Sequence, residues 1–402
     1  ISLIDMKINI IHHDKSYNMM QDAENISYIL KRLKEKPKVT HIHINSTKIE
    51  EASINIFIEN INMLHIGKAK YNIFIPNQHY FHKNWIPFVN EFDYIFCKTK
   101  YCLESFKSHV TDHNKLKYTG WKSPDIYYPN VSKEYNEYLA FYQEPVFYPI
   151  KYIIELWKPE YPNLNIVCHN YSSIKTLKSQ DNIKYIDEKM TSEEFHILFN
   201  RCGVHLCLSE IDCFNHLVNQ AKIVKSIPIS VSKGPSAELF NTEWGFSVAS
   251  KKKKLKDSLA SKYIFDKEDF GEVIKKVMDT HISALEIMGN NGRVDAMKTQ
   301  QSNEHHIMET LDNILKESKT IVKPGLNIEY KPNTGRDHDR SRQNPRNKRK
   351  DAKKESKNKE SKNKESRDNK QIAPLVKDAD LPKISIITPT YNRKHIFRMT
   401  VL

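Results

Sequence analysis

Short apolar runs alternate with segments of helical spacing along the first third of the chain. The runs are rich in β-branched and aromatic residues, which favour strands, and residues 23–36 form an amphipathic helical segment that Pro37 ends. Another apolar helix is expected before the last run. Strands that alternate with helices predict a doubly wound parallel sheet, here without a G-x-G-x-x-G loop. The predicted strands are residues 7–12, 40–45, 54–58, 71–75 and 93–97.

The same alternation resumes near residue 137 and predicts a second sheet of this kind. Thr191 opens one helix with a Thr-Ser-Glu-Glu sequence, which is typical of a helix N-cap. The four lysines at 251–254 are expected on a solvated loop, and Lys222 and Lys225 are expected to point to water. The predicted strands are residues 138–142, 165–168, 204–208 and 227–231, and the predicted helices are residues 152–157, 191–200, 214–225, 269–278 and 302–315.

The formal net charge of +14 raises the possibility of nucleic-acid binding, but much of it lies in one segment. Residues 331–370 carry 16 Lys and Arg against 7 Asp and Glu, so this segment accounts for +9 of the total. It is almost without apolar residues and repeats the sequence KESKN, which predicts a flexible tether. Nucleic acid is therefore an unlikely partner.

The cysteines and the hydropathy indicate a soluble intracellular chain. The six cysteines include no C-x-x-C pair, and three lie in apolar strand-like runs, so we expect buried reduced thiols and no zinc site. No apolar run reaches about 18 residues, so no membrane span is expected. The opening residues do not read as a signal peptide, and Met6 is a possible true start. We expect a cytoplasmic location.

Two acidic residues, Glu210 and Asp212, follow the predicted strand at 204–208 and precede a predicted helix. Ligands of open α/β sheets bind at the carboxyl ends of strands, and a helix N-terminus offers unpaired N–H groups to an anion. A phosphate-bearing substrate fits such a place. The alternatives are that the two acids are solvated loop residues or a helix cap, and that His216 is a buried core histidine.

This stretch resembles the carboxy-terminal half of GT-B glycosyltransferases, in the branch similar to glycosyltransferase family 4. Both motif glycines are replaced, by Cys213 and Asn215, and the second motif glutamate is Gln220. Asparagine tolerates a left-handed backbone, whereas Cys213 in that geometry would cost about 1–2 kcal/mol. The matching residues are Ser209, Glu210, Asp212, Phe214, His216, Ala221, Pro228, Pro235, Glu238 and Leu239.

Three segments of the first half extend the resemblance: residues 72–81 (NIFIPNQHYF), 93–106 (DYIFCKTKYCLESF) and 118–125 (YTGWKSPD). In GT-B enzymes this half receives the acceptor. The resemblance therefore implies that Asn77, Gln78 and His79 line the acceptor side of the cleft. The alternative is an ordinary turn after a strand.

The resemblance implies transfer of a sugar, of hexosyltransferase type, from a nucleotide-diphosphate sugar to a glycan or other hydroxyl acceptor. It implies retention of configuration and no cofactor for this half. Where the family has phosphate-binding cations, this chain offers Gln143, Glu144, Pro145 and Tyr148 and no cation until Lys151, which favours the alternative of a degenerate module that binds glycan or acts as a scaffold. We expect Asp212, His216, Gln220 and Glu238 to meet in one cleft. The implied catalytic residues are Asp212, Glu210 and His216, and the implied donor-binding residues are Ser209, Phe214, Gln220, Lys233, Gly234 and Glu238.

Residues 382–393 (PKISIITPTYNR) read as a strand and turn that resemble the start of a GT-A, family 2 glycosyltransferase domain. The resemblance implies that Pro389, Tyr391 and Asn392 contact a nucleotide, and that Mn or Mg serves this truncated domain only. The expected organisation is an acceptor-side domain at residues 6–128, a donor domain at 129–320, a linker at 321–381 and the GT-A start at 382–402. The fold class is α/β, with two Rossmann-like domains facing a cleft.

Overall fold

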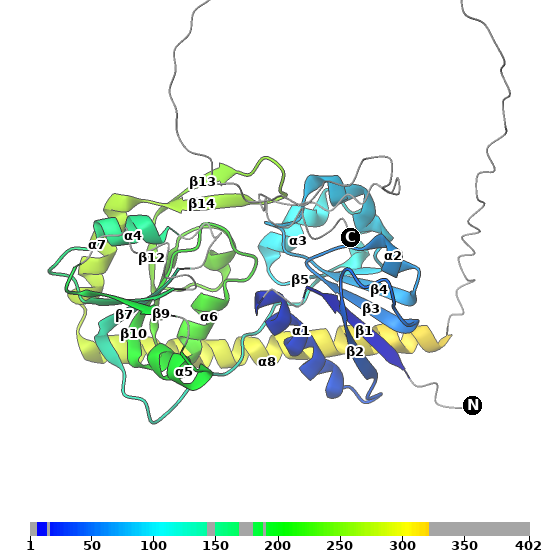
Figure 1. Cartoon of the computed structure of the whole chain (residues 1–402), viewed down its shortest axis with the longest axis horizontal. Helices are drawn as coiled ribbons and strands as arrows, with labels where there is room; N and C mark the ends of the chain where they lie inside the picture. Colours follow the sequence, from blue (N-terminus) through cyan, green and yellow to red (C-terminus); the bar gives the residue numbers. More distant parts are fainter. Residues whose placement is uncertain (1–5, 14–16, 143–148, 169–179, 188–189, 321–402) are drawn as a thin grey trace, which may run out of the picture. The chain divides into compact units, whose positions relative to one another are not determined.

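The computed structural model describes residues 6–13, 17–142, 149–168, 180–187 and 190–320. All of these belong to one compact unit (Figure 1). The predicted linker, the predicted GT-A start with Pro389, Tyr391 and Asn392, and the loop at 143–148 lie outside the described residues.

The first half is a six-stranded parallel sheet in the order β2-β1-β3-β4-β5-β6. Its central strands are almost wholly buried, as expected for a parallel sheet covered on both faces. The order reverses between β1 and β3. The elements are β1 (Lys7–His12), α1 (Tyr17–Lys31), β2 (Lys38–His43), β3 (Ala52–Ile58), α2 (Met63–Ile66), β4 (Ala69–Ile75), η1 (Lys83–Glu91), β5 (Tyr94–Cys97), α3 (Lys100–Lys107), η2 (His113–Lys115) and β6 (Leu116–Tyr118).

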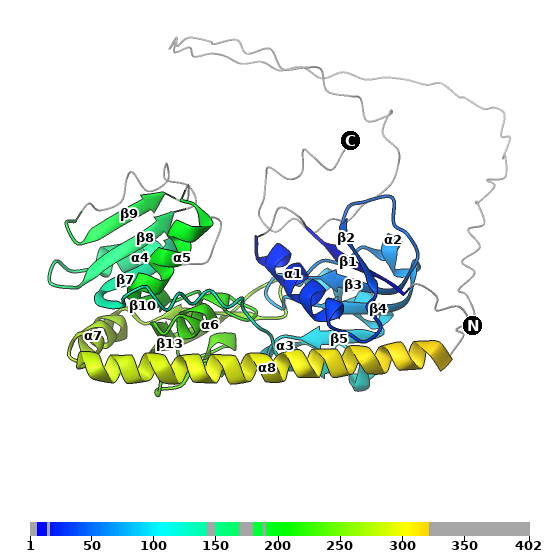
Figure 2. The same cartoon turned by 90° about the horizontal axis from the view of Figure 1, so that it is seen from below.

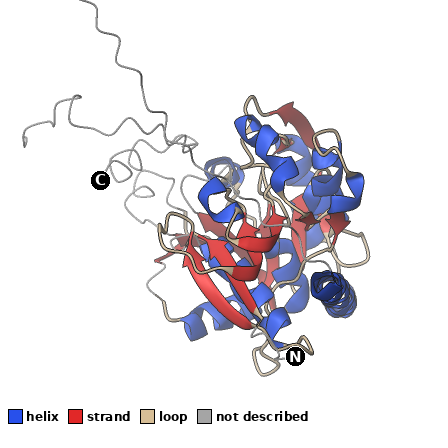
Figure 3. Ribbon diagram, turned by 90° about the vertical axis from the view of Figure 1, so that its right-hand side faces the viewer, coloured by secondary structure: helices blue, strands red, loops and turns tan. Residues whose placement is uncertain are grey.

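The second half is another six-stranded parallel sheet, in the order β12-β11-β10-β7-β8-β9. Here the order reverses between β7 and β10, and ligands of open α/β sheets bind at the carboxyl ends of the strands at such a point. Helices lie on either side of the strands (Figure 3). The elements are β7 (Glu134–Tyr142), α4 (Ile150–Leu156), β8 (Asn163–Cys168), β9 (Ile183–Asp187), α5 (Ser192–Arg201), β10 (Cys202–Cys207), α6 (His216–Ile223), β11 (Ile227–Val231), η4 (Pro235–Glu238), β12 (Phe246–Val248) and α7 (Lys267–Met278).

One long helix, α8 (Ile282–Thr320), joins the two halves (Figure 2). It packs on α6 of the second half and on α1 of the first. Its side chains Ile307, Leu311 and Ile314 are buried in the same apolar cluster as residues of α1. Asn303 of α8 donates a hydrogen bond of 2.6 Å to the carbonyl of Trp121, in the segment that crosses between the halves. The described helix begins 20 residues before the predicted 302–315.

The predicted alternation of strands and helices is confirmed, with shifts at several element ends. Helix α1 begins at Tyr17 and ends at Lys31, whereas residues 23–36 were predicted. The predicted cap of α5 is confirmed, because Thr191 and Glu194 form a reciprocal capping box. All six cysteines are buried and free, as predicted.

Two predictions about lysines are wrong. The four-lysine run is the edge strand of a hairpin, in which β13 (Ser250–Lys254) pairs antiparallel with β14 (Ser261–Phe265), although its lysines are exposed as expected. Exposed lysines on an edge strand prevent further strand pairing. Lys222 is buried rather than solvated, because its ammonium bonds Asp295 at 2.5 Å and lies over the Trp244 ring.

Candidate active site

The loop between β10 and α6 folds around its own acidic residue. The Asp212 carboxylate accepts hydrogen bonds from the backbone N–H groups of Phe214 (3.1 Å) and Asn215 (2.6 Å). Asn215 is the N-cap of α6, with a left-handed backbone (φ 53°), and its side chain accepts from the N–H of Val218. Cys213 is not among the described residues with positive φ, so the strain predicted there does not arise. Asn215 thus takes the geometry that the sequence suggested it would tolerate.

The side chains of Glu210 and Ser209 both have partners within the second half. The Glu210 carboxylate pairs with Lys262 of β14 at 2.8 Å, and its carbonyl accepts from the N–H of Tyr263 at 2.8 Å. The Ser209 hydroxyl donates to the carbonyl of Ile211 at 2.6 Å. Glu210 is therefore a paired, nearly buried acid and not a solvated one.

A buried group of charges lies where the two halves meet. The ammonium of Lys98, at the carboxyl end of β5, pairs with Asp22 of α1 and lies 3.8 Å from the Glu59 carboxylate. Trp121 donates from its indole nitrogen to Asp22 at 2.6 Å. The Nε2 atom of His216, at the start of α6, lies 3.3 Å from Asp22 Oδ1. We call these five residues the junction cluster.

The carboxyl groups in and beside the junction cluster have pKa values shifted in opposite directions. Burial by itself raises the pKa of Asp22, but the Lys98 ammonium and His216 together lower it to about 2. Burial is the main cause that raises the pKa of Glu59, with Lys98 opposing it, and burial likewise raises the pKa of Asp212. Asp22 therefore stays ionised at neutral pH. Glu59 and Asp212 are the carboxyls better suited to exchange a proton.

The β13–β14 hairpin, residues 250–265, extends from the second half to the first, and we call it the strap. Ser258 of the strap donates to the carbonyl of Gln78 at 2.9 Å. His79 donates from Nε2 to the carbonyl of Ser261 at 3.1 Å. The hairpin was not predicted, because the four lysines at 251–254 indicated a solvated loop. It covers the segment that was predicted to line the acceptor side.

The three predicted acceptor-side residues are buried and do more than form a turn. Asn77 donates to the Glu59 carboxylate at 3.1 Å, which ties it to the junction cluster. Gln78 donates to the carbonyl of Asp212 at 3.2 Å, so it reaches the opposite half. The Gln78 Oε1 atom is buried and has no partner within the described part of the chain. His79 is also buried.

The remaining predicted donor-side residues belong to α6 and to the segment that precedes η4. Gln220 is buried on α6, one helical turn after His216. Gly234 (φ 82°) lies under the Tyr263 ring, where a Cβ atom would come within 2.5 Å of the ring. Lys233 is exposed. The packing of Tyr263 explains why glycine is needed at this position.

Glu238 turns toward the first half instead of toward Asp212. Its carboxylate accepts from the N–H groups of Lys100 (2.8 Å) and Tyr101 (2.6 Å), in the first turn of α3. A carboxylate at this end of a helix binds unpaired N–H groups and favours the helix dipole. The structure thus places His216 in the junction cluster, whereas the Glu238 carboxylate caps α3.

Glu238→Ala is expected to destabilise the protein by about 1 kcal/mol, because the first turn of α3 loses its carboxylate cap. Urea unfolding of the full chain measures this change. Glu243→Ala is a suitable control, since no hydrogen bond or ion pair of the Glu243 side chain is recorded among the described residues. Equal stability of the two variants would show that the cap contributes nothing.

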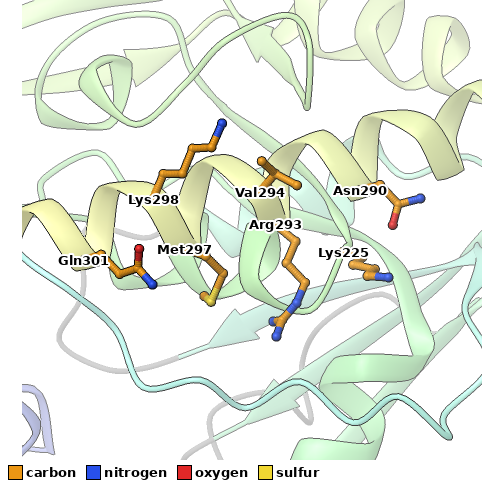
Figure 4. Close-up of a pocket in the computed structure, with 7 residues that line it drawn as sticks. All are labelled: Lys225, Asn290, Arg293, Val294, Met297, Lys298 and Gln301. Carbon is orange, nitrogen blue, oxygen red and sulfur yellow. The ribbon is translucent and has the colours of Figure 1, made fainter.

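One hollow among the described residues is remote from the predicted site, and another adjoins it. A groove of about 390 Å³ follows α8 and is lined by Lys225, Asn290, Arg293, Val294, Met297, Lys298 and Gln301 (Figure 4). It contains none of the predicted site residues, and its Arg293 is already engaged by Asp125 at 3.0 Å. A second hollow of about 190 Å³ lies between the halves and includes Lys98, Phe214 and Glu238 in its wall. The second is the one that adjoins the candidate site.

Sequence reasoning missed Asp22, Glu59, Lys98 and Trp121. Two of them were within reach, because Lys98 and Trp121 lie in segments that carry the family resemblance. Asp22 also left a signal: it occupies a position next to the buried Ala23 in an otherwise apolar helix face, and a buried acid needs a partner. Nothing in the sequence pairs these four residues with one another.

Within the described residues, every helix is too short or too polar to cross a membrane. No protein-family model matches this sequence, and no curated protein does. Solved structures do match. HepE of Anabaena, in complex with UDP and glucose, is 11% identical, with a TM-score of 0.56 over 77% of this chain and 100% of that one.

Two further structures match to a similar extent. A glycosyltransferase of Rickettsia africae is 12% identical, with a TM-score of 0.58 over 78% of this chain and 99% of that one. WaaG, a glycosyltransferase involved in lipopolysaccharide biosynthesis, is 10% identical, with a TM-score of 0.54 over 75% and 99%. Likeness at such low identity establishes fold and not activity. Together with the two six-stranded parallel sheets, it shows that the described residues have the GT-B fold.

Proposed function

We propose that the described unit is a glycosyltransferase of hexosyltransferase type, which moves a sugar from a nucleotide-diphosphate sugar to a hydroxyl acceptor. One observation carries the proposal: Asp212 follows β10 at the point where the strand order of the second sheet reverses, and its backbone carbonyl accepts a hydrogen bond from Gln78 of the first half. Ligands of open α/β sheets bind at such a point. The likeness to HepE, which was solved with UDP-glucose, makes UDP-sugars the first donors to test.

Sugar transfer breaks the bond between the anomeric carbon and the diphosphate oxygen and forms a bond to the acceptor oxygen. The acceptor proton must be taken up, and the charge on the leaving diphosphate must be stabilised. Asp212 lies in the loop that follows β10, and burial raises its pKa. The N-terminus of α6 and Lys262, once released from Glu210, supply positive charge for the diphosphate. This assignment needs no bound metal in this half.

The acceptor side is formed by Asn77, Gln78 and His79. The unpaired Oε1 atom of Gln78 supports this part of the proposal, because a buried amide oxygen gains a partner when a sugar hydroxyl donates to it.

We also propose that residues from Pro382 onward begin a second transferase module of GT-A type, with Mn or Mg as its metal. The whole protein would then be bifunctional.

A second candidate function is a GT-B module that binds glycan or acts as a scaffold without turnover. Two observations favour it. The Asp212 carboxylate is engaged by two N–H groups of its own loop. The hollow between the halves is about 190 Å³, which is below the roughly 300 Å³ of the smaller typical small-molecule sites.

Calorimetry of the full chain with UDP, UDP-glucose, GDP and GDP-mannose tests donor binding, and release of UDP measures transfer to an acceptor or to water. Asp212→Asn is expected to lower turnover by about 10²-fold or more with little change in UDP affinity, because the carboxylate acts on the reacting sugar. Asp279→Asn, at the exposed end of α7, is the control.

Three results are distinguishable. Saturable binding with turnover that depends on Asp212 supports the transferase. Saturable binding without turnover supports the module without catalysis. Absence of saturable binding at millimolar ligand overturns the donor site altogether.

A further inference from the structure

The backbone of the Asp212 loop is held by side chains from the opposite half. Gln78 Nε2 donates to the carbonyl of Asp212 at 3.2 Å. The Thr99 hydroxyl donates to the carbonyl of Cys213 at 3.3 Å. The Lys98 ammonium lies 3.7 Å from Cys213 Sγ. Three side chains of the first half therefore contact two consecutive residues of the second. We call these three contacts the grip.

These three side chains are themselves fixed. Gln78, Lys98 and Thr99 are each at most 2% exposed, so water does not compete for their polar groups. Thr99 is also the N-cap of α3 and accepts from the N–H of Cys102 at 3.1 Å. Lys98 is anchored by the junction cluster. The side chains of Thr99 and Lys98 are therefore held by partners within the first half.

The grip determines where the Asp212 carboxylate points. Within the loop, that carboxylate is bound to the N–H groups of Phe214 and Asn215. Gln78 anchors the carbonyl of the peptide that joins Asp212 to Cys213, and Thr99 anchors the carbonyl of the next peptide, whose N–H donates to the Asp212 carboxylate. Rotation of either peptide would break its anchor, so the carboxylate and its backbone partners keep one arrangement.

We propose that Gln78 and Thr99, supported by Lys98, are positioning residues for Asp212. The acceptor-side half thereby sets the geometry of the acid on the donor side. The consequence for turnover rests on the proposed function, whereas the consequence for loop order does not. Cys213 takes part through its side chain, which receives the Lys98 contact at a position where the resembling family has glycine.

A simpler alternative is that these contacts only hold the halves together. Lys83 provides the comparison, because its ammonium donates to the carbonyl of Lys256 at 2.7 Å. This contact also joins the halves, through the strap, but it does not touch the Asp212 loop. Lys83→Met therefore removes a contact between the halves and leaves the grip intact.

Hydrogen exchange of the full chain tests the grip without any ligand. Gln78→Met and Thr99→Val are each expected to speed exchange of the Phe214 and Asn215 amides by about tenfold, the change that follows loss of one buried hydrogen bond. Thr99→Ser keeps the hydroxyl and is expected to restore the slow exchange. Lys83→Met is expected to leave these amides unchanged.

Equal exchange in all four variants, or an equal increase in Lys83→Met, would overturn the proposal. Thermal melts identify any variant that fails to fold. If Thr99→Val does not fold, the exchange rates of the Phe214 and Asn215 amides are compared between Gln78→Met and Thr99→Ser.

Turnover supplies the second readout. With UDP-glucose, Gln78→Met and Thr99→Val are expected to lower kcat about tenfold while the Kd for UDP stays within about twofold, because positioning acts on the reacting geometry and not on nucleotide binding. Turnover equal to that of the unchanged chain would contradict positioning. If the unchanged chain binds no nucleotide sugar, the proposed function fails, and the exchange experiment alone decides the grip.

Discussion

Lys98→Met is expected to lower the free energy of unfolding by about 3–5 kcal/mol, because it leaves two carboxylates buried without their cation. Lys98 lies 1% exposed between Asp22 and Glu59, and its ring contact with Trp121 (5.0 Å to the centroid) adds to the loss. Burial by itself lowers the pKa of Lys98, but Asp22, Cys213 and Glu59 raise it, so the ammonium stays charged throughout the neutral range. Urea unfolding of the full chain at pH 7 measures the effect.

Lys107→Met is the matched control. Lys107 pairs with Glu104 at 3.3 Å on the exposed face of α3, where such pairs contribute at most about 0.5 kcal/mol. Adding Asp22→Asn and Glu59→Gln to Lys98→Met is expected to recover part of the loss, since neutral amides cost less to bury than unpaired carboxylates. A Lys98→Met protein as stable as Lys107→Met would contradict the junction cluster.

Acidification from pH 7 to 5 is expected to remove about 2 kcal/mol of stability through each of two buried histidines, His79 and His205. Burial lowers the pKa of His79 to about 4, although its bond to the Ser261 carbonyl raises it, and burial lowers the pKa of His205 to about 3. The unfolded chain, with histidine pKa near 6.5, therefore binds more protons than the folded chain in this range. The contribution of the two neutral histidines to the free energy of unfolding is fully present above pH 6.5. It is lost as the pH falls toward their pKa values in the folded chain.

Comparison of the unchanged chain with His205→Gln isolates one of these contributions. The raised pKa values of Glu59 and Asp212 act in the opposite direction, but they are common to both proteins. The loss of stability between pH 7 and 5 is expected to be about 2 kcal/mol smaller in His205→Gln. Urea midpoints at the two pH values provide the measurement, and an equal loss in both proteins would show that His205 does not titrate as expected.

The fold was largely predictable because its signal is local. The run at Ile227–Val231 is a strand with the predicted bounds, and the Thr191 cap opens α5 as its sequence indicates. Such patterns follow from side-chain periodicity and from backbone N–H groups that need partners. The predicted ends of α1 and α8 were wrong because packing on neighbouring elements, and not propensity, decides where those helices end.

The candidate site was predictable only in part. The sequence located the Asp212 loop and the acceptor-side segment, and it indicated that Asn215 accepts a left-handed backbone. It did not indicate that Glu238 would cap α3, or that Lys222 would be buried beside Asp295. Both outcomes depend on partners more than 70 positions away along the chain.

The sequence by itself determined two parallel sheets, the loop that carries Glu210 and Asp212, and the segment that carries Gln78. Only the tertiary structure decided that Gln78 and Thr99 hold that loop. It also decided that Lys98 lies between Asp22 of α1 and Glu59, which follows β3. The physical reason is that secondary structure is fixed by interactions within a few residues. The energy of a buried charge depends instead on which distant groups the fold places around it.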